Sequence, residues 1–194
     1  MREQTTRKRS QKVGLVLMIP TASLWLAGCS DSRMIAEVFP SVAHCVAKGH
    51  PQARCESEFA RAERRHEFLA PYYRSQTDCA SDFGASQCAA VRPPASAGLS
   101  ASGEQYRPHM AGILSSEFIN TLQPGANHPT LTTQPLYQAL NDASRYRTSA
   151  NCIISSTASL VQVTERSAQL TAAGIVRRGG FGANATTRHC SAAS

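Results

Sequence analysis

The first 28 residues constrain this chain most, because they decide which part of it folds and in which compartment. Residues 1–12 carry five basic residues and one acid, and residues 13–27 are uncharged and mostly apolar. A basic start, an apolar run and small residues before a cleavage point are typical of a secretory signal peptide. The run is shorter than the roughly 20 apolar residues that a membrane-spanning helix needs. We therefore predict a signal peptide over residues 1–28.

The residues at the cleavage point indicate a lipid anchor. Leu26-Ala27-Gly28-Cys29 is similar to the bacterial lipobox, in which the cysteine thiol receives a diacylglyceryl group and becomes the acylated amino terminus. Several acyl chains together give stable membrane attachment, whereas a single chain holds only marginally. Ser30, rather than Asp, follows the cysteine, which resembles an outer-membrane address in enterobacterial-type sorting. We predict lipid attachment at Cys29 and an outer-membrane location on the periplasmic side, with inner-membrane retention as the less favoured alternative.

Removal of the leader changes the charge balance of the chain. The whole sequence has a formal net charge of +7, but residues 29–194 keep 15 basic and 12 acidic residues, a net charge of +3. Charge alone therefore gives no support for a nucleic-acid partner. Aromatic residues make up only 6% of the sequence, and small or polar residues dominate beyond residue 89. This composition predicts a thin hydrophobic core.

The remaining cysteines predict disulfides. An even number of cysteines in an exported chain favours disulfide bonds, because the periplasm is oxidising. We prefer the pairs Cys45–Cys55 and Cys79–Cys88, and crossed pairs between these two segments stay open as an alternative. The six candidates are Cys45, Cys55, Cys79, Cys88, Cys152 and Cys190.

Residues 38–90 are predicted to form a cysteine-rich helical module. Ser41 is placed to cap a brief helix over 42–48, and a third helix over 78–83 is expected to end at Gly84. The strongest pattern predicts a helix over 52–69, with charged residues, Glu58 among them, outside its apolar face. A unit of roughly 50 residues buries little apolar surface, so disulfides are expected to support it. The predicted apolar face consists of Cys55, Phe59, Ala62, His66 and Leu69.

The other segments carry weaker patterns. Residues 29–37 are predicted to be a lipid-anchored tether, and residues 91–194 an irregular Ala/Ser/Thr/Gly/Pro-rich region that ends in a glycine-rich tail. Within this region we expect a linker over 92–98, a short helix over 135–143 and short strands near 153–154, 160–163 and 174–176. The tail at 177–182 is expected to be flexible unless something docks on it. The predicted fold class is therefore mainly α, a small disulfide-stapled helical module followed by a largely irregular, low-complexity C-terminal region.

The order of several short motifs resembles the YgiB-like family of uncharacterised proteobacterial lipoproteins, which is defined as a domain of unknown function. The resemblance implies a lipid anchor, an envelope location and four structural cysteines, and it implies no activity. Cys152 and Cys190 depart from the family pattern, and they either pair with each other or stay free. The matching motifs are Leu26-Ala27-Gly28-Cys29, Cys45 and Cys55 around Gly49-His50-Pro51, Ala60-Arg61-Ala62-Glu63-Arg64, Asp78-Cys79-Ala80-Ser81-Asp82-Phe83-Gly84 with Cys88, Met110-Ala111-Gly112, Gln134-Pro135-Leu136-Tyr137 and Arg178-Gly179-Gly180-Phe181-Gly182.

Catalytic and metal-binding patterns are weak in this sequence. The histidines and cysteines near His44 and His50 lack the closely spaced pairs typical of zinc sites, and oxidation would remove the thiolates. No Cys-x-x-Cys pair, Gly-x-Ser-x-Gly elbow, Walker loop or His-Glu-x-x-His motif is present. Asp78 and Asp82 are interpreted as capping and solubility residues of a short exposed helix. We predict no catalytic residue, no metal and no cofactor.

These observations lead to one functional hypothesis and one alternative. The first is a non-catalytic, lipid-anchored cell-envelope protein that acts through contacts with another envelope component. Its expected partners are the membrane, through the covalent lipid at Cys29, and an envelope protein of unknown identity, without nucleic acid. The alternative is a periplasmic thiol- or metal-handling protein that uses the region from Cys45 to Cys88.

Overall fold

The computed structural model describes residues 33–92, 103–116, 133–164, 170 and 174–185. All of these lie in one compact unit, Asp31–Ser194. The predicted signal peptide, Cys29 and Cys190 lie outside the described residues, as does most of the linker predicted over 92–98. In the part of the chain that is described, no helix is long and apolar enough to cross a membrane.

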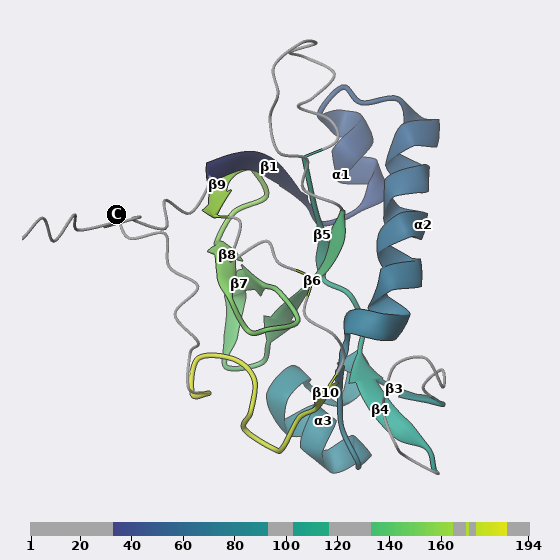
Figure 1. Cartoon of the computed structure of the whole chain (residues 1–194), viewed down its shortest axis with the longest axis vertical. Coiled ribbons are helices and arrows are strands. Elements are labelled where there is room, and N and C mark those ends of the chain that lie inside the picture. The colour runs from purple at the N-terminus through teal and green to yellow at the C-terminus, as the bar shows by residue number, and fades with distance from the viewer. Residues whose placement is uncertain (1–32, 93–102, 117–132, 165–169, 171–173, 186–194) are drawn as a thin grey trace, which may run out of the picture. The chain divides into compact units, whose positions relative to one another are not determined.

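The main feature of the fold is a six-stranded antiparallel sheet with the strand order β8-β7-β6-β5-β1-β9 (Figure 1). The sheet is nearly closed, because its two edge strands, β8 and β9, also approach each other. In register, Val38 of β1 lies opposite Leu114 of β5, and Met34 lies opposite Val163 of β9. The strands are β1 Arg33–Phe39, β5 Gly112–Ser115, β6 Gln134–Ala139, β7 Asp142–Arg147, β8 Ile153–Ser155 and β9 Leu160–Thr164.

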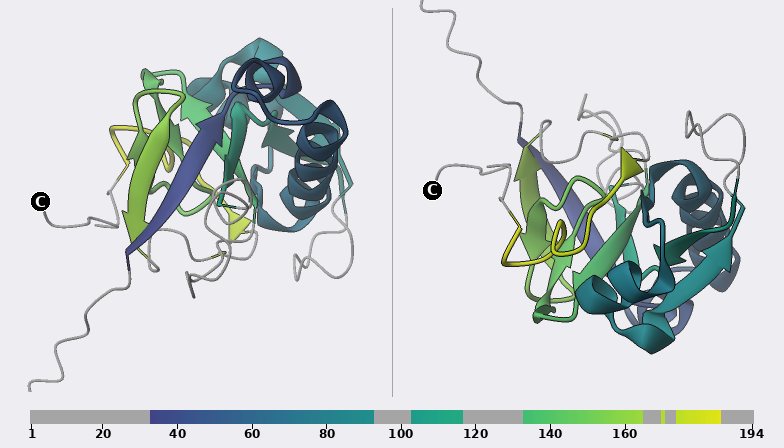
Figure 2. Two further views of the ribbon diagram at one scale, coloured as in Figure 1. Left: turned by 90° about the horizontal axis from the view of Figure 1, so that it is seen from above. Right: turned by 90° about the horizontal axis from the view of Figure 1, so that it is seen from below.

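Helices and two small sheets complete the unit. The helices α1 and α2 lie together beside the main sheet, and α3 lies near the two small sheets (Figures 1 and 2). The strands β2 and β10 pair in parallel, and β3 and β4 pair antiparallel. The bounds are α1 Val42–Ala47, α2 Gln52–Leu69, α3 Gln76–Phe83, the 3-10 turn η1 Ala85–Gln87, β2 Pro71–Tyr72, β3 Cys88–Val91, β4 Gln105–Pro108 and β10 Gly174–Ile175.

The three predicted helices are confirmed, and their ends have the expected chemistry. Ser41 and Ser75 each accept a hydrogen bond from a backbone N–H in the first turn of the following helix, at 3.1 Å. Such N-caps satisfy donors that have no partner within the helix. Gly84, with φ of 92°, ends α3 in a conformation that favours glycine.

The buried face of α2 differs from the prediction at one position. Cys55, Ala62, His66 and Leu69 are buried as expected, but Glu58 is buried as well, whereas the predicted core residue Phe59 is half-buried. The Glu58 carboxylate accepts a hydrogen bond from Thr133 and lies 3.3 Å from the Arg61 guanidinium. The polar partners of Glu58 explain how a carboxylate occupies the buried face.

The core consists of three clusters that join early and late parts of the chain. Along β1, Met34, Ala36 and Val38 point into the cluster inside the curved sheet, whereas Ile35 is 47% exposed. This alternation is the period of two that a strand imposes. The outer face of the sheet packs on α1 and α2 through the cluster Phe39, Cys45, Cys55, Ala62 and Ile113. The third cluster includes Tyr73, Phe83, Tyr137 and Phe181.

The prediction of a mainly α fold with an irregular C-terminal region is wrong. The described residues are 36% strand and 30% helix. Arg33–Phe39, most of which was assigned to the tether, is an interior strand, and the helix expected over 135–143 is the hairpin of β6 and β7. The strands expected near 153–154, 160–163 and 174–176 are present as β8, β9 and β10. The helices of 38–90 therefore share their core with later strands and do not build one alone.

Candidate functional site

The carboxylate of Asp82 is the centre of the polar structure around α3. Asp82 is 5% exposed and accepts a hydrogen bond from the Tyr73 hydroxyl at 2.8 Å. It also accepts hydrogen bonds from the backbone N–H groups of Gly179, at 2.8 Å, and Phe181, at 3.2 Å. Burial and the neighbouring Asp82 carboxylate raise the pKa of Tyr73, so this phenol stays protonated and donates. The buried charge thus has its acceptor capacity filled by the chain itself.

Residues 177–183, here called the docked segment, are held at several further points. The side-chain amide of Asn151 donates to the Gly182 carbonyl at 3.2 Å and accepts from the Gly182 N–H at 3.0 Å. Phe181 is 2% exposed, and its ring centroid lies 4.8 Å from that of Phe83. The glycine-rich tail, predicted to be flexible unless something docks on it, is therefore docked on its own fold.

Gly182 cannot be replaced without a change in this arrangement. Its φ is +87°, a left-handed conformation that side-chain-bearing residues rarely adopt. A Cβ atom at this position would lie 2.2 Å from the Asn141 amide oxygen and 2.7 Å from the Ala139 Cβ atom. The close approach of the docked segment to β6 and β7 thus requires glycine.

A buried arginine supports the asparagine that holds the docked segment. Arg147 is 1% exposed, and its guanidinium pairs with the Asp142 carboxylate. It also donates to the Asn151 amide oxygen at 3.1 Å and to the Asn151 carbonyl at 3.3 Å. These contacts orient the Asn151 amide toward Gly182 and give hydrogen-bond partners to both terminal nitrogens of the buried guanidinium, whereas its Nε has none among the described residues.

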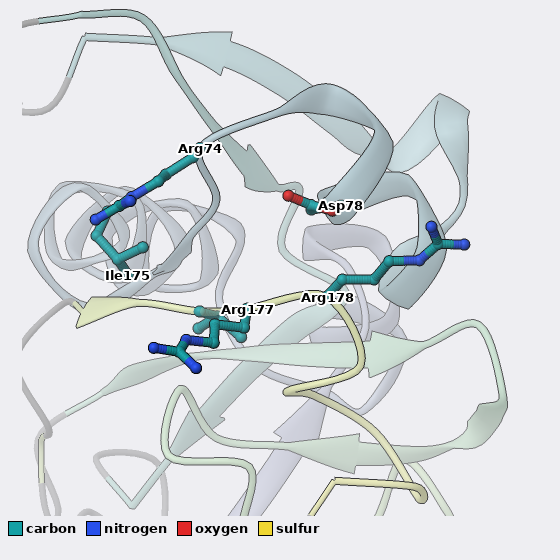
Figure 3. Close-up of a pocket in the computed structure, with 6 residues that line it drawn as sticks. Arg74, Asp78, Ile175, Arg177 and Arg178 are labelled. Carbon is teal, nitrogen blue, oxygen red and sulfur yellow. The ribbon is translucent and has the colours of Figure 1, made fainter.

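A pocket of about 440 Å³ lies between the start of α3 and the segment that includes β10 (Figure 3). We call it the arginine pocket. In Figure 3 the side chains of Arg177 and Arg178 extend in different directions from neighbouring positions. Its lining residues are Arg74, Asp78, Ile175, Val176, Arg177 and Arg178.

The lining of the arginine pocket carries three guanidinium groups and one carboxylate. Within the described residues, the side chains of Arg74, Arg177 and Arg178 form no hydrogen bond or ion pair with the rest of the chain. Arginine stays charged at any physiological pH and presents five donors in a planar fork. The arrangement can therefore hold an anion that accepts several hydrogen bonds.

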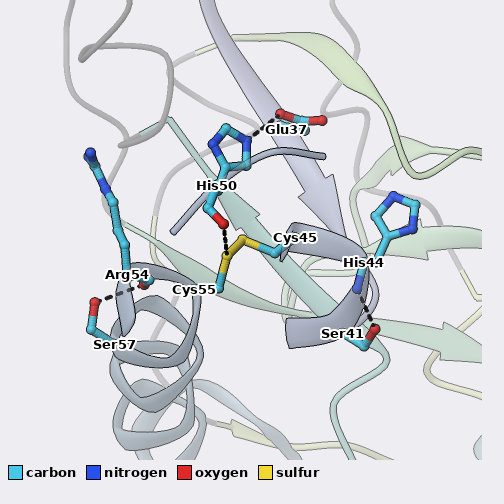
Figure 4. Close-up of a disulfide and its surroundings, with 8 residues drawn as sticks. All are labelled: Glu37, Ser41, His44, Cys45, His50, Arg54, Cys55 and Ser57. Atoms are coloured by element: carbon cyan, nitrogen blue, oxygen red, sulfur yellow. Dashed lines mark hydrogen bonds and ion pairs between the residues drawn. A yellow bond between two sulfur atoms is a disulfide. The ribbon is translucent and has the colours of Figure 1, made fainter. Parts of the chain in front are cut away.

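The structure contains the two disulfides preferred from the sequence, Cys45–Cys55 and Cys79–Cys88, with Cα–Cα distances of 5.9 Å and 6.1 Å. The first joins α1 to α2 (Figure 4), and the second joins α3 to β3. Cys152 is buried and also disulfide-bonded. The pairs Cys45–Cys55 and Cys79–Cys88 each connect elements that lie close together along the chain.

The histidines considered as metal ligands have different surroundings. The His50 ring lies 3.7 Å from the Glu37 carboxylate, whereas only the backbone N–H of His44 donates to Ser41 and its ring Nε2 is buried without a hydrogen-bond partner among the described residues (Figure 4). His66 forms a buried 2.9 Å hydrogen bond with the Tyr137 hydroxyl. Burial, with Arg107 and then His109 nearby, lowers the pKa of His66 to about 3, so this ring is neutral. The described residues contain no group of three His, Cys, Asp or Glu that could hold a metal ion.

Sequence reasoning missed the central role of Asp82, which was interpreted as part of an exposed helix. Asp82 lies three residues after Cys79 and therefore on the same face of α3 as a buried disulfide. That spacing was a signal for burial. It did not identify the bonding partners, because Gly179 and Phe181 lie 97 and 99 residues away in the sequence.

The chain was compared with models of known protein families, and one of them matches most of its length. The family model described as "Protein of unknown function (DUF1190)" matches residues 33–191, a range that contains every residue of the fold described above. The chain belongs to the DUF1190 family. This is the family of unknown function that its motifs indicated as YgiB-like.

The DUF1190 chain is also similar to several proteins named UPF0441. It is 30% identical to one from Serratia proteamaculans, over 73% of this chain and 64% of the relative. It is 29% identical to one from Pectobacterium atrosepticum (58% and 54%) and 30% identical to one from Klebsiella pneumoniae (66% and 58%). The chain thus spans about half to two thirds of the length of these relatives. No solved structure matches it.

Proposed function

We propose that this DUF1190 protein is a lipid-anchored component of the cell envelope. In this proposal Cys29 carries the lipid, the outer membrane holds it, and the folded unit faces the periplasm. It acts through contacts with another envelope component and not through catalysis. The observation that carries the proposal is the lipobox-like Leu26-Ala27-Gly28-Cys29, followed within a few residues by a disulfide-bonded unit.

The disulfides support an exported location. Cys45, Cys55 and Cys79 are completely buried, and their pairs hold the short helices α1 and α3 to neighbouring elements. Disulfides persist in oxidising compartments such as the periplasm and are rare in the bacterial cytoplasm. A chain that depends on such bonds for stability is suited to the envelope.

The distance between the proposed anchor and the fold limits what the protein can reach. β1 begins at Arg33, four residues after Cys29, and four extended residues span at most about 14 Å. β1 pairs with β5 on one side and β9 on the other. It cannot leave the sheet to lengthen the tether without breaking both ladders. A contact made by this unit therefore lies close to the membrane surface.

The buried charged groups favour a structural role over a catalytic one. Asp82, Arg147 and Glu58 all have hydrogen-bonding partners within the chain. His66 is neutral, buried and bonded to a tyrosine. Groups occupied in this way are not positioned to exchange protons with a substrate. The exposed arginines of the arginine pocket, by contrast, are accessible to a partner.

Mass spectrometry of the protein isolated from its native membranes tests the anchor. We expect a mature chain that lacks residues 1–28 and begins at an acylated Cys29, recovered in the outer-membrane fraction. Cys29→Ser is expected to remain as the uncleaved precursor, because the thiol that receives the lipid is missing. An intact Met1, or a mature terminus without acyl groups, would contradict the proposal.

Thiol counting separates this proposal from the thiol- or metal-handling alternative. The protein is denatured with and without reduction, free thiols are labelled, and bound zinc is measured. We expect Cys45, Cys55, Cys79 and Cys88 to be fully oxidised and no zinc to be bound. A reduced pair or stoichiometric zinc would favour the alternative.

In-cell photocrosslinking identifies the contacted component. A crosslinking residue is placed at Arg178, on the rim of the arginine pocket, and at Arg64, on the exposed face of α2, as a matched position. We expect a discrete adduct from Arg178 and a weaker or different pattern from Arg64. Tyr137 is unsuitable for this purpose, because its side chain is completely buried.

A further inference from the structure

We propose that the arginine pocket binds a phosphate monoester of a sugar or polyol. This inference deepens the proposed function, because it names the chemistry of the envelope component that the protein contacts. It rests on Arg74, Arg177 and Arg178, together with the position of the docked segment, and not on the lipid at Cys29. The two proposals can therefore fail separately.

Charge selects an anion for this pocket. Arg74, Arg177 and Arg178 all line the arginine pocket without an ion pair to any described residue, and Asp78 balances at most one of them. A dianionic phosphate monoester offers three oxygens that accept from several guanidinium forks at once. A single carboxylate has fewer acceptor positions for three arginines. The lining therefore fits a phosphate better than a carboxylate.

The rest of the lining selects an ester over free phosphate. The pocket volume of about 440 Å³ is much larger than one phosphate group needs, and small-molecule sites commonly occupy roughly 300–1,000 Å³. Ile175 and Val176 provide an apolar wall for the carbon skeleton of a ligand. Among the described residues, the half-buried Asp78 carboxylate forms no hydrogen bond or ion pair, and it can accept hydrogen bonds from ligand hydroxyl groups. A phosphorylated sugar or polyol has a phosphate for the arginines, a carbon skeleton for the apolar wall and hydroxyl groups for Asp78.

The backbone that carries the arginines is fixed on both sides. Upstream of Arg177, β10 pairs with β2, and the Val176 N–H donates to the Tyr72 carbonyl at 2.6 Å. Downstream of Arg178, Asp82 binds the Gly179 N–H. Arg74 follows β2 by two residues and is positioned by the same pairing. The backbone of the pocket is thus held in place before binding, which lowers the part of the entropic cost of binding that comes from ordering the backbone.

Isothermal titration of the purified, full-length mature protein with sn-glycerol 3-phosphate tests the proposal. We expect saturable binding, weaker binding of inorganic phosphate and none of glycerol. Arg177→Gln with Arg178→Gln should weaken the affinity roughly tenfold or more, because each removes charge-assisted hydrogen bonds. Arg64→Gln with Arg92→Gln, an equal change of charge at exposed positions elsewhere, should change it less than about twofold. The substituted side chains are exposed, so folding should be unchanged by circular dichroism.

Two results would overturn the proposal. One is the absence of saturable binding by the unsubstituted protein. The other is an equal loss of affinity in the two double variants, which would mean that net charge alone attracts the ligand. The full-length Cys29→Ser chain should bind sn-glycerol 3-phosphate as tightly as the mature protein. A failed anchor with retained binding would thus refute the proposed attachment and leave the phosphate site standing.

A second arm identifies the source of the phosphate. The mature protein is reconstituted into phosphatidylcholine vesicles that contain either phosphatidic acid, a phosphate monoester lipid, or phosphatidylglycerol, a diester. Loss of sn-glycerol 3-phosphate binding only with phosphatidic acid would assign the site to a lipid headgroup. Equal binding in both vesicles would assign it to a phosphorylated sugar or polyol outside the bilayer. Either result supports a phosphate monoester site.

Discussion

Asp82 shows how one residue connects segments that are distant in the sequence. Its carboxylate receives hydrogen bonds from a phenol and from two backbone N–H groups of the docked segment. A buried carboxylate costs free energy unless such partners are present, and here those partners are also the link between α3 and the C-terminal part of the fold. The same interaction that stabilises the charge therefore holds Arg177 and Arg178 at the arginine pocket.

Replacement of Asp82 is expected to destabilise the protein strongly. Asp82→Ala leaves the Tyr73 hydroxyl and two backbone N–H groups without an acceptor, so we expect a loss of about 3 kcal/mol in the free energy of unfolding. Urea titration followed by circular dichroism measures the change. Asp78→Ala, on the same helix, is the matched control and should cost less than about 1 kcal/mol. Equal losses from both substitutions would refute the role assigned to Asp82.

His66 is expected to make stability depend on pH. Its pKa is about 3 in the folded protein and near 6.5 in the unfolded chain, so the unfolded chain binds more protons between these values. Stability should therefore be complete above pH 6.5 and decrease as the pH falls toward 3. Between pH 7 and pH 5 the contribution of this group is about 2 kcal/mol. We expect His66→Gln to reduce the difference between urea unfolding energies at these two pH values, and an unchanged difference would contradict the assignment.

Among the elements, the docked segment depends on backbone geometry as well as on the burial of Phe181. Gly182 has a positive φ, and any Cβ at that position meets Asn141 and Ala139. Gly182→Ala is thus expected to destabilise the segment by about 1–3 kcal/mol and to increase hydrogen exchange over residues 177–183. Gly174→Ala is the control, because a Cβ there meets no atom within 4 Å. Similar exchange in the two variants would exclude a special requirement at Gly182.

The two described disulfides are expected to contribute similarly to stability. They close sequence separations of 10 and 9 residues, and loops of this size gain about 3 kcal/mol from a crosslink. Cys45→Ala with Cys55→Ala, and separately Cys79→Ala with Cys88→Ala, should each lower the free energy of unfolding by about this amount. Chemical denaturation of the two double variants measures it. Losses under about 1 kcal/mol would mean that packing alone holds these helices.

The three described helices could be predicted from local sequence patterns, whereas most of the strands could not. α1, α2 and α3 have local signals, namely the serine caps, the glycine after α3 and the apolar period of α2. β6 is buried on nearly every residue and contains Pro135, so it lacks the alternation that predicts a strand. β7 ends in the buried Arg147, whose charge indicates exposure when its partners are unknown. The docking of Phe181 depends on Asp82, a partner that no local pattern identifies.

At the scale of the whole unit, early and late segments are inseparable. All six strands of the main sheet contribute to one cluster, from Met34 in β1 to Val163 in β9, with Ile154 of β8 packed against it. The helices add a second cluster on the other face of the same sheet. β1 follows the proposed lipid attachment within four residues and occupies an interior position of this sheet. Only three residues would therefore separate the proposed anchor from the first strand, so the anchor would limit how far the folded unit can lie from the membrane.

A longer tether tests this limit. Insertion of 12 Gly/Ser residues after Asp31 gives a connection of 15 residues between Cys29 and Arg33, with a root-mean-square reach of about 19–23 Å. The insertion precedes β1, so the free energy of unfolding should be unchanged. We expect the crosslink from Arg178 to its envelope partner to decrease, because the unit is no longer held at the membrane surface. Replacement of residues 30–32 by Gly-Ser-Gly, which keeps the length, should preserve the crosslink. An undiminished crosslink after the insertion would mean that the partner is reached independently of the short tether, and that the position of β1 next to Cys29 has no functional consequence.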